Sequence, residues 1–194
     1  MRSKVTSHSV GLVDATISPD GTVTFSLPQY YLWKEVRSRR HIMMSGKGEM
    51  VSETIQSALH RKIAETPGSA TLELLEPEPF YMILIQDKAV PNGMHAKMFF
   101  FAHATGDRRQ FSRVYGEEEL GKMVDMEAET LIKAMEVERT VPLHLEVTKM
   151  ALAAQAMKQV AVYHRYASIL HDFNPPRGLT DSDRAVLQAY DKWF

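Results

Sequence analysis

Basic side chains concentrate in one stretch of this chain, and their chemistry suits an anionic partner. The 194-residue sequence is nearly neutral, with 23 lysine and arginine residues against 24 aspartate and glutamate residues. Within residues 28 to 62 bases outnumber acids, whereas residues 63 to 87 and 117 to 138 are acidic. Because neutralising phosphates releases counterions, the basic stretch predicts a nucleic-acid contact. The predicted contact residues in it are Lys34, Arg37, Arg39, Arg40 and Lys47.

The order of elements around these bases resembles the ribbon-helix-helix DNA-binding family. A β-rich run ends at Leu27-Pro28 and is followed by two helical patterns, the second of which matches the family at Ser52, Ile55, Ala58 and Leu59. The resemblance implies that the strand pairs with its twin in a homodimer and that alternate side chains enter the major groove. Those groove-facing residues would be Thr22, Thr24 and Ser26. The stretch from Leu27 to Ala58 is longer than the family's usual spacing.

Two other interpretations of the charge remain open. The basic residues are also what is expected of an ordinary solvated helix face, or of a helix that docks against the acidic segments of the same chain. Apolar strands and an alanine- and methionine-rich helical stretch would likewise suit a protein-interaction or assembly subunit. None of these three interpretations involves catalysis.

Catalytic motifs are sparse. The tripeptide His103-Ala104-Thr105 has the His-x-Thr form of two-histidine phosphoesterases. Such an enzyme needs a second copy of the motif, and the nearest candidate, His144-Leu145-Glu146, has glutamate at the hydroxyl position. An enzyme acting on a phosphorylated small molecule around His103, Arg108 and Arg109 is therefore the third hypothesis. The eight histidines are scattered and cysteine is absent, so we expect no metal and no cofactor.

The elements that must carry these residues begin with a hairpin. Residues 10 to 17 and 22 to 27 are rich in β-branched and apolar residues and flank the turn signal Ser18-Pro19-Asp20-Gly21. Pro28 is expected to break the second strand. Helical spacing then predicts helices over residues 30 to 42 and 49 to 65.

The remainder predicts a meander followed by helices. Strands are expected at residues 70 to 75, 80 to 86, 96 to 104 and 110 to 115, and the last three would form the meander. Residues 81 to 85 and 98 to 101 are apolar without alternation, so both faces of the sheet should be covered, by helices or by a second copy. Helices are expected from Glu117 to the Pro142 region, from there to about Phe173, and from Asp181 to Phe194.

The fold class is therefore α+β, an antiparallel sheet of hairpin and meander packed with N-terminal helices and a helical C-terminal segment. Residues 1 to 67 and 68 to 194 would together form one compact unit. No apolar run approaches the roughly 20 residues of a membrane helix, and no secretory signal is evident, so we expect a cytoplasmic, soluble protein. The functional prediction is a non-catalytic DNA-binding homodimer, with a non-enzymatic assembly subunit as the alternative.

Overall fold

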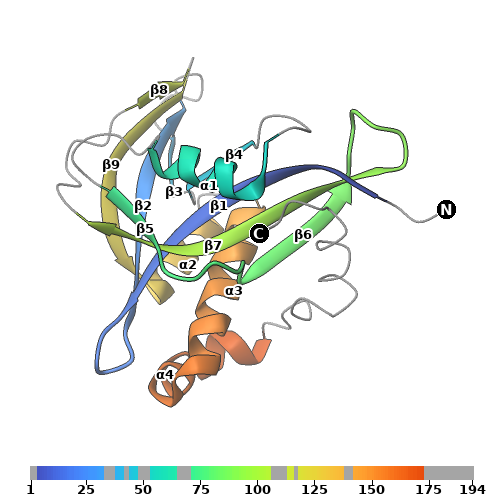
Figure 1. Cartoon of the computed structure of the whole chain (residues 1–194). Coiled ribbons are helices and arrows are strands. Elements are labelled where there is room, and N and C mark those ends of the chain that lie inside the picture. The colour runs from blue at the N-terminus through green and yellow to red at the C-terminus, as the bar shows by residue number, and fades with distance from the viewer. Residues whose placement is uncertain are drawn as a thin grey trace.

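The computed structural model describes residues 4–32, 38–41, 44–47, 53–64, 71–105, 113–115, 118–137 and 142–172. The strands are β1 (Lys4–Ile17), β2 (Val23–Leu32), β3 (Ser38–His41), β4 (Met44–Lys47), β5 (Thr71–Leu74), β6 (Tyr81–Gln86), β7 (Gly93–Thr105), β8 (Arg113–Tyr115) and β9 (Glu118–Glu127). The helices are α1 (Ile55–Ala64), α2 (Ala128–Val137), α3 (Pro142–Lys158) and α4 (Val160–Asp172). The fold is α+β (Figure 1).

The described strands share one sheet with the order β5-β7-β1-β2-β9-β8, and β4, β6 and β3 pair with β1, β7 and β2. The long strands β1 and β7 run parallel, in a ladder that ends at the pair Val13 and Phe101. The other strand pairings among the described residues are antiparallel. The expected wholly antiparallel sheet was thus wrong at its centre, where β1 and β7 lie side by side.

The predicted N-terminal hairpin is confirmed by the antiparallel pairing of β1 with β2. Asp20 shapes its turn by accepting the backbone N–H of Thr22 at 3.0 Å. Gly21 has a φ of 81°, and a Cβ there would stand 2.8 Å from the backbone of Ala161 on α4. The turn therefore needs a glycine both for its backbone conformation and for its close approach to α4.

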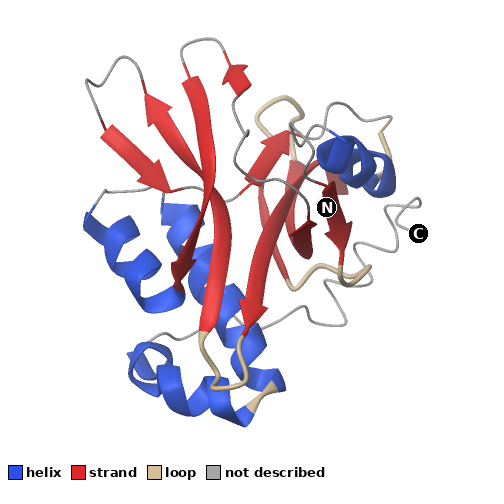
Figure 2. Ribbon diagram, turned by 90° about the vertical axis from the view of Figure 1, so that its left-hand side faces the viewer, coloured by secondary structure: helices blue, strands red, loops and turns tan. Residues whose placement is uncertain are grey.

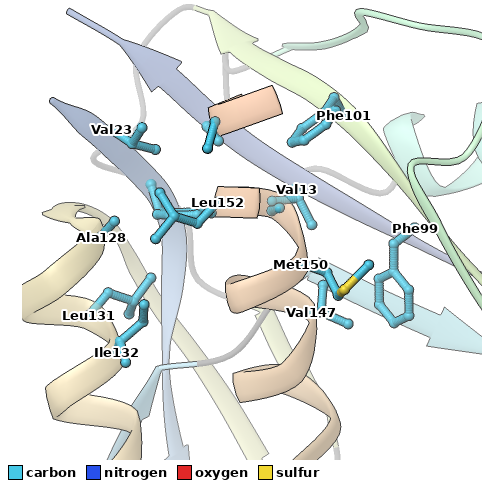
Figure 3. Packing of buried hydrophobic residues seen from close by; sticks show 14 of the residues in the cluster. Val13, Val23, Phe99, Phe101, Ala128, Leu131, Ile132, Val147, Met150 and Leu152 are labelled. Carbon is cyan, nitrogen blue, oxygen red and sulfur yellow. The ribbon is translucent and has the colours of Figure 1, made fainter. Parts of the chain in front are cut away.

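Helices cover both faces of the sheet, as the two non-alternating apolar strands predicted. Helix α1 packs on one face, against Leu12 of β1 and Phe100 of β7. Helices α2, α3 and α4 pack on the other face, where Val13, Val23 and Phe101 meet Leu131 and Leu152 among others (Figures 2 and 3). Alternate residues of β1 and β7 thus enter two separate cores, which explains why these strands are apolar throughout.

The helix expected over residues 30 to 42 was wrong. Strand β2 continues through Pro28 to Leu32, with a register shift between Pro28 and Tyr30 where β2 pairs with β9. A bulge is where a strand accommodates a proline that has no N–H to donate. The basic residues that follow form β3, in which Arg40 pairs with Tyr30. Pairing with neighbouring strands outweighed the local helical spacing.

The C-terminal half also departs from expectation. Residues 118 to 127 form strand β9 and only then does α2 begin, because β9 completes the sheet beside β2. The long helix is divided into α3 and α4, which end and begin on either side of Gln159. In the expected meander β6 does pair with β7, but β8 pairs with β9 instead. The helix expected over residues 181 to 194 lies outside the described residues.

None of the described helices combines the length and the apolarity that crossing a bilayer requires.

Candidate active site

A buried carboxylate stands at the point where the central strands separate. Asp14 follows Val13, the last β1 residue paired with β7, and is only 1% exposed. Its Oδ2 accepts the backbone N–H of Ala104 on β7 at 2.8 Å. The side chain thus replaces the next hydrogen bond of the ladder and holds the ends of β1 and β7 together. A buried carboxylate needs such donors to offset its lost hydration.

The second oxygen of this carboxylate faces an imidazole. Nδ1 of His103 lies 3.2 Å from Oδ1 of Asp14, and the His103 side chain is 34% exposed. Because a carboxylate accepts hydrogen bonds, Nδ1 is the ring nitrogen that carries the proton in this pair. In the neutral ring Nε2 then holds a lone pair and can accept a proton. A partly exposed imidazole oriented by a buried carboxylate is the arrangement of a general base.

Further polar groups continue across the sheet from this pair. On β2, Ser26 is the register partner of Asp14, and its hydroxyl donates to Asp125 of β9. On β5, the exposed Glu73 is the register partner of His103. Of these groups, the carboxylate of Asp14 is the one that contacts the His103 imidazole, and Glu73 lies opposite His103 on the neighbouring strand. Its position depends on the long-range strand order rather than on any local motif.

Helix α1 carries a second polar group on its own face of the sheet. Arg61 binds Glu53 through two parallel hydrogen bonds, Nε to Oε1 at 2.9 Å and Nη2 to Oε2 at 3.0 Å. Thr54 caps the helix by accepting the backbone N–H of Ser57 at 3.0 Å. On β1 beneath this face, burial lowers the pKa of His8, while the charge of Glu53 opposes that shift. His8 is therefore a neutral core histidine near neutral pH.

Within the described ranges, no group of three or more histidine, aspartate or glutamate side chains could hold a metal ion. The two histidines of the phosphoesterase hypothesis are not brought together either. His144 lies close enough to Lys97 of β7 for the lysine charge to lower its pKa. His103 is six residues beyond Lys97 on the same strand, about 20 Å away at roughly 3.3 Å per residue. The paired-histidine interpretation was wrong, because α3 places His144 beside another part of the strand.

The residues predicted to contact nucleic acid are dispersed. Lys34 and Arg37 lie outside the described residues, whereas Arg39 and Arg40 are on β3 and Lys47 is on β4. The three groove-facing candidates belong to the hairpin. Thr22 and Ser26 are buried, Thr22 donates its hydroxyl to Asp20, and Thr24 pairs with Thr16 and Glu127. Strand β2 is thus hydrogen-bonded on both sides, and it has no free edge for a twin strand.

The comparisons with known proteins bear on the fold. No family model and no curated protein matches the sequence. Among solved structures, a NUDIX hydrolase from Nitrosomonas europaea matches with a TM-score of 0.50 and 13% sequence identity, over 76% of this chain and 88% of its own. The chain therefore has a NUDIX-like fold. A NUDIX-family hydrolase from Clostridium perfringens has a TM-score of 0.41 and 17% identity, over 73% and 97% of the two chains.

This NUDIX-like fold corrects the functional predictions. The ribbon-helix-helix interpretation was wrong, because the fold is NUDIX-like and the strand that suggested it, β2, is paired within a mixed sheet. The expectations of a DNA partner, of an assembly subunit and of a protein without enzymatic activity are overturned by this fold, which matches the structure of a hydrolase. Sequence reasoning singled out His103 but missed Asp14. A single aspartate inside the apolar run VGLVDATI was the available signal.

Proposed function

We propose that this protein is a hydrolase of a phosphorylated small molecule, in which His103 activates the attacking water. The observation that carries the proposal is the contact between the partly exposed imidazole of His103 and the fully buried carboxylate of Asp14. The likeness to a NUDIX hydrolase supports hydrolysis as the reaction class.

The chemistry follows from the protonation of the pair. With Nδ1–H donated to Asp14, Nε2 of His103 takes a proton from water while the water oxygen bonds to phosphorus. The bond from phosphorus to the leaving oxygen breaks, and the leaving oxygen takes up a proton. Asp14 remains a carboxylate throughout and stabilises the imidazolium that forms. Water is the only co-reactant required.

The substrate class is supported by the residues that follow β7. Arg108 and Arg109 come shortly after His103 in the sequence, and arginine binds phosphate oxygens through paired hydrogen bonds. For the compartment we keep the cytoplasm, as expected for a sequence without cysteine.

The proposal is tested by measuring phosphate release from a panel of phosphate esters and phosphoanhydrides, with and without Mg²⁺, which accompanies many phosphorylated substrates. His103→Gln should lower kcat by about 100-fold or more with little change in KM, because it removes a general base. Asp14→Asn should act in the same direction, because an amide N–H facing the ring favours the wrong tautomer.

The matched control is His164→Gln, which changes an exposed histidine on α4 and should leave turnover intact. Unfolding midpoints of all variants would identify losses due to misfolding. Turnover that survives His103→Gln in a folded protein would contradict the role of His103. A wild-type protein that releases no phosphate from any member of the panel would contradict the substrate class.

A further inference from the structure

A second polar network lies on the same two strands, near the opposite end of the β1–β7 ladder. Asp87, just after β6, accepts three hydrogen bonds through its two carboxylate oxygens. Its Oδ2 accepts the hydroxyls of Thr6 at 2.7 Å and Ser7 at 2.6 Å, and its Oδ1 accepts the backbone N–H of Ala89 at 2.9 Å. These hydrogen bonds, of which the one from Ser7 has the largest effect, lower the pKa of Asp87 to about 2. Asp87 is therefore ionised and acts only as an acceptor.

The network continues through an imidazole to another serine. Ser7 Oγ lies 2.7 Å from Nδ1 of His95, and Nε2 of the same ring lies 3.1 Å from Oγ of Ser9. Ser7 is paired with His95 in the β1–β7 register, so their side chains lie on one face of the sheet. Ser9 follows two residues later and is on that face as well.

The directions of these hydrogen bonds follow from proton count. Ser7 has one hydroxyl proton and gives it to the ionised Asp87, so its oxygen must accept from Nδ1 of His95. Nδ1 then carries the ring proton, and Nε2 presents a lone pair to Ser9. The hydroxyl of Ser9 is therefore the donor in the last bond. The chain of bonds runs from Ser9 through His95 and Ser7 to Asp87.

We propose that Ser9 is a nucleophilic serine that reacts with small carboxylic esters, with His95 as its base. A nucleophile, a base within hydrogen-bond reach and a third group that orients the base are the parts such a site needs. Here Ser7 orients His95 and is itself held by Asp87, so both are positioning residues. The side chains of Ser9 and His95 are partly exposed, which leaves them open to a small reagent.

The reaction balances without a further reagent. Ser9 Oγ bonds to the ester carbonyl carbon while its proton passes to Nε2 of His95. The bond to the leaving alcohol then breaks, and His95 returns the proton to that alcohol. Water hydrolyses the acyl-serine by the same transfers in reverse. Lys97, the register partner of Ser9, provides a positive charge on this face for the developing oxyanion.

This site shares no side chain with the Asp14–His103 pair, so the two proposals fail or succeed separately. The experiment uses diisopropyl fluorophosphate, an organophosphorus reagent that traps activated serines. Ser9 Oγ would bond to phosphorus as fluoride leaves, and peptide mass spectrometry would locate the adduct. Release of p-nitrophenol from p-nitrophenyl acetate measures turnover in the same samples.

We expect one adduct, at Ser9, together with loss of esterase activity. His95→Gln should slow labelling by about 100-fold or more and abolish its decline at acid pH, because the group that must lose a proton is gone. Ser7→Ala should slow labelling less, and Ser7→Thr should restore it by returning the hydroxyl. Ser168→Ala, which alters an exposed serine on α4, should change nothing.

Mapping the adduct in the wild-type protein keeps the test independent of how well any variant folds. An unlabelled protein would overturn the proposal. So would an adduct at a different residue, or labelling of Ser9 at an unchanged rate in folded His95→Gln.

Discussion

The backbone N–H of Val23 donates a hydrogen bond to the phenolic oxygen of Tyr166 over 3.0 Å. Both residues are buried, with exposures of 0% and 2%. This bond joins the start of β2 to α4, at the point where the φ and ψ of Tyr166, −108° and 15°, depart from helical values. The hairpin that carries Asp14 and Ser26 is thereby fixed to the helical layer.

Removing this acceptor should destabilise the fold. Tyr166→Phe keeps the ring but leaves the N–H of Val23 buried without its partner, which costs about 1–3 kcal/mol. Urea unfolding followed by circular dichroism would measure the change. Tyr163→Phe is the matched control, because the Tyr163 side chain is largely exposed and its substitution should be close to neutral. Equal effects of the two variants would show that the bond contributes nothing.

The paired hydrogen bonds between Arg61 and Glu53 should matter more than an exposed ion pair. The Glu53 side chain is 16% exposed and Arg61 is 34% exposed, whereas Lys133 and Glu129 on α2 are 70% and 57% exposed. Glu53→Gln should therefore cost about 1 kcal/mol or more, and Glu129→Gln clearly less, because solvent screens the exposed pair. Thermal unfolding of the two variants makes the comparison. A larger loss in Glu129→Gln would reverse the ranking.

Stability should fall in mild acid because of His144. Burial, and then the positive charge of Lys97, lower the pKa of His144 from 6.5 to about 4. Between pH 6.5 and 4 the unfolded chain binds a proton on His144 that the folded chain does not bind. The free energy of unfolding is therefore unaffected by His144 above pH 6.5 and decreases as the pH falls toward 4. The loss is on the order of 2–3 kcal/mol. Burial of His8 acts in the same direction.

His144→Gln tests this prediction through unfolding free energies measured at several pH values. The variant should lose part of the decline between about pH 6.5 and 4, because the titrating ring is gone. His164→Gln, an exposed substitution on α4, should retain all of it. An unchanged decline in His144→Gln would assign the acid sensitivity to other groups.

A further loss should appear at lower pH. Hydrogen bonds from Ser7, Thr6 and Ala89 lower the pKa of Asp87 to about 2. A carboxyl group whose pKa is lowered by folding stabilises the fold above its unfolded pKa, near 4, and loses that effect as the pH falls to about 2. Carbon-13 NMR titration of the carboxyl group gives the value directly. A titration midpoint near 4 would show that the three hydrogen bonds are weak.

Local signals in the sequence predicted the features that depend on neighbouring residues. The turn Ser18-Pro19-Asp20-Gly21 predicted the hairpin because its glycine adopts the positive φ that the turn requires. The non-alternating strands predicted a sheet covered on both faces. In contrast, residues 118 to 127 form a strand because β2 lies beside them, and helical spacing alone could not indicate that neighbour.

Only one of the two residues of the candidate site could be predicted from the sequence, for a related reason. His103 could be identified from its position at a strand end, but its partner Asp14 is 89 residues away in the sequence. Spacing motifs describe residues on one element, whereas this pair exists only because β1 and β7 are parallel neighbours. The same holds for Ser7 and His95.

The central ladder also determines when this protein can fold. Ser7 and His95 are 88 residues apart in sequence, and parallel pairing over such distances closes a long loop before many native contacts form. At a synthesis rate of about 5–20 residues per second, β7 is synthesised several seconds after β1. Among the described strands, β2 and β4 are the sheet neighbours of the apolar residues of β1 during that interval. The nascent chain is thus most prone to aggregation before β7 has emerged.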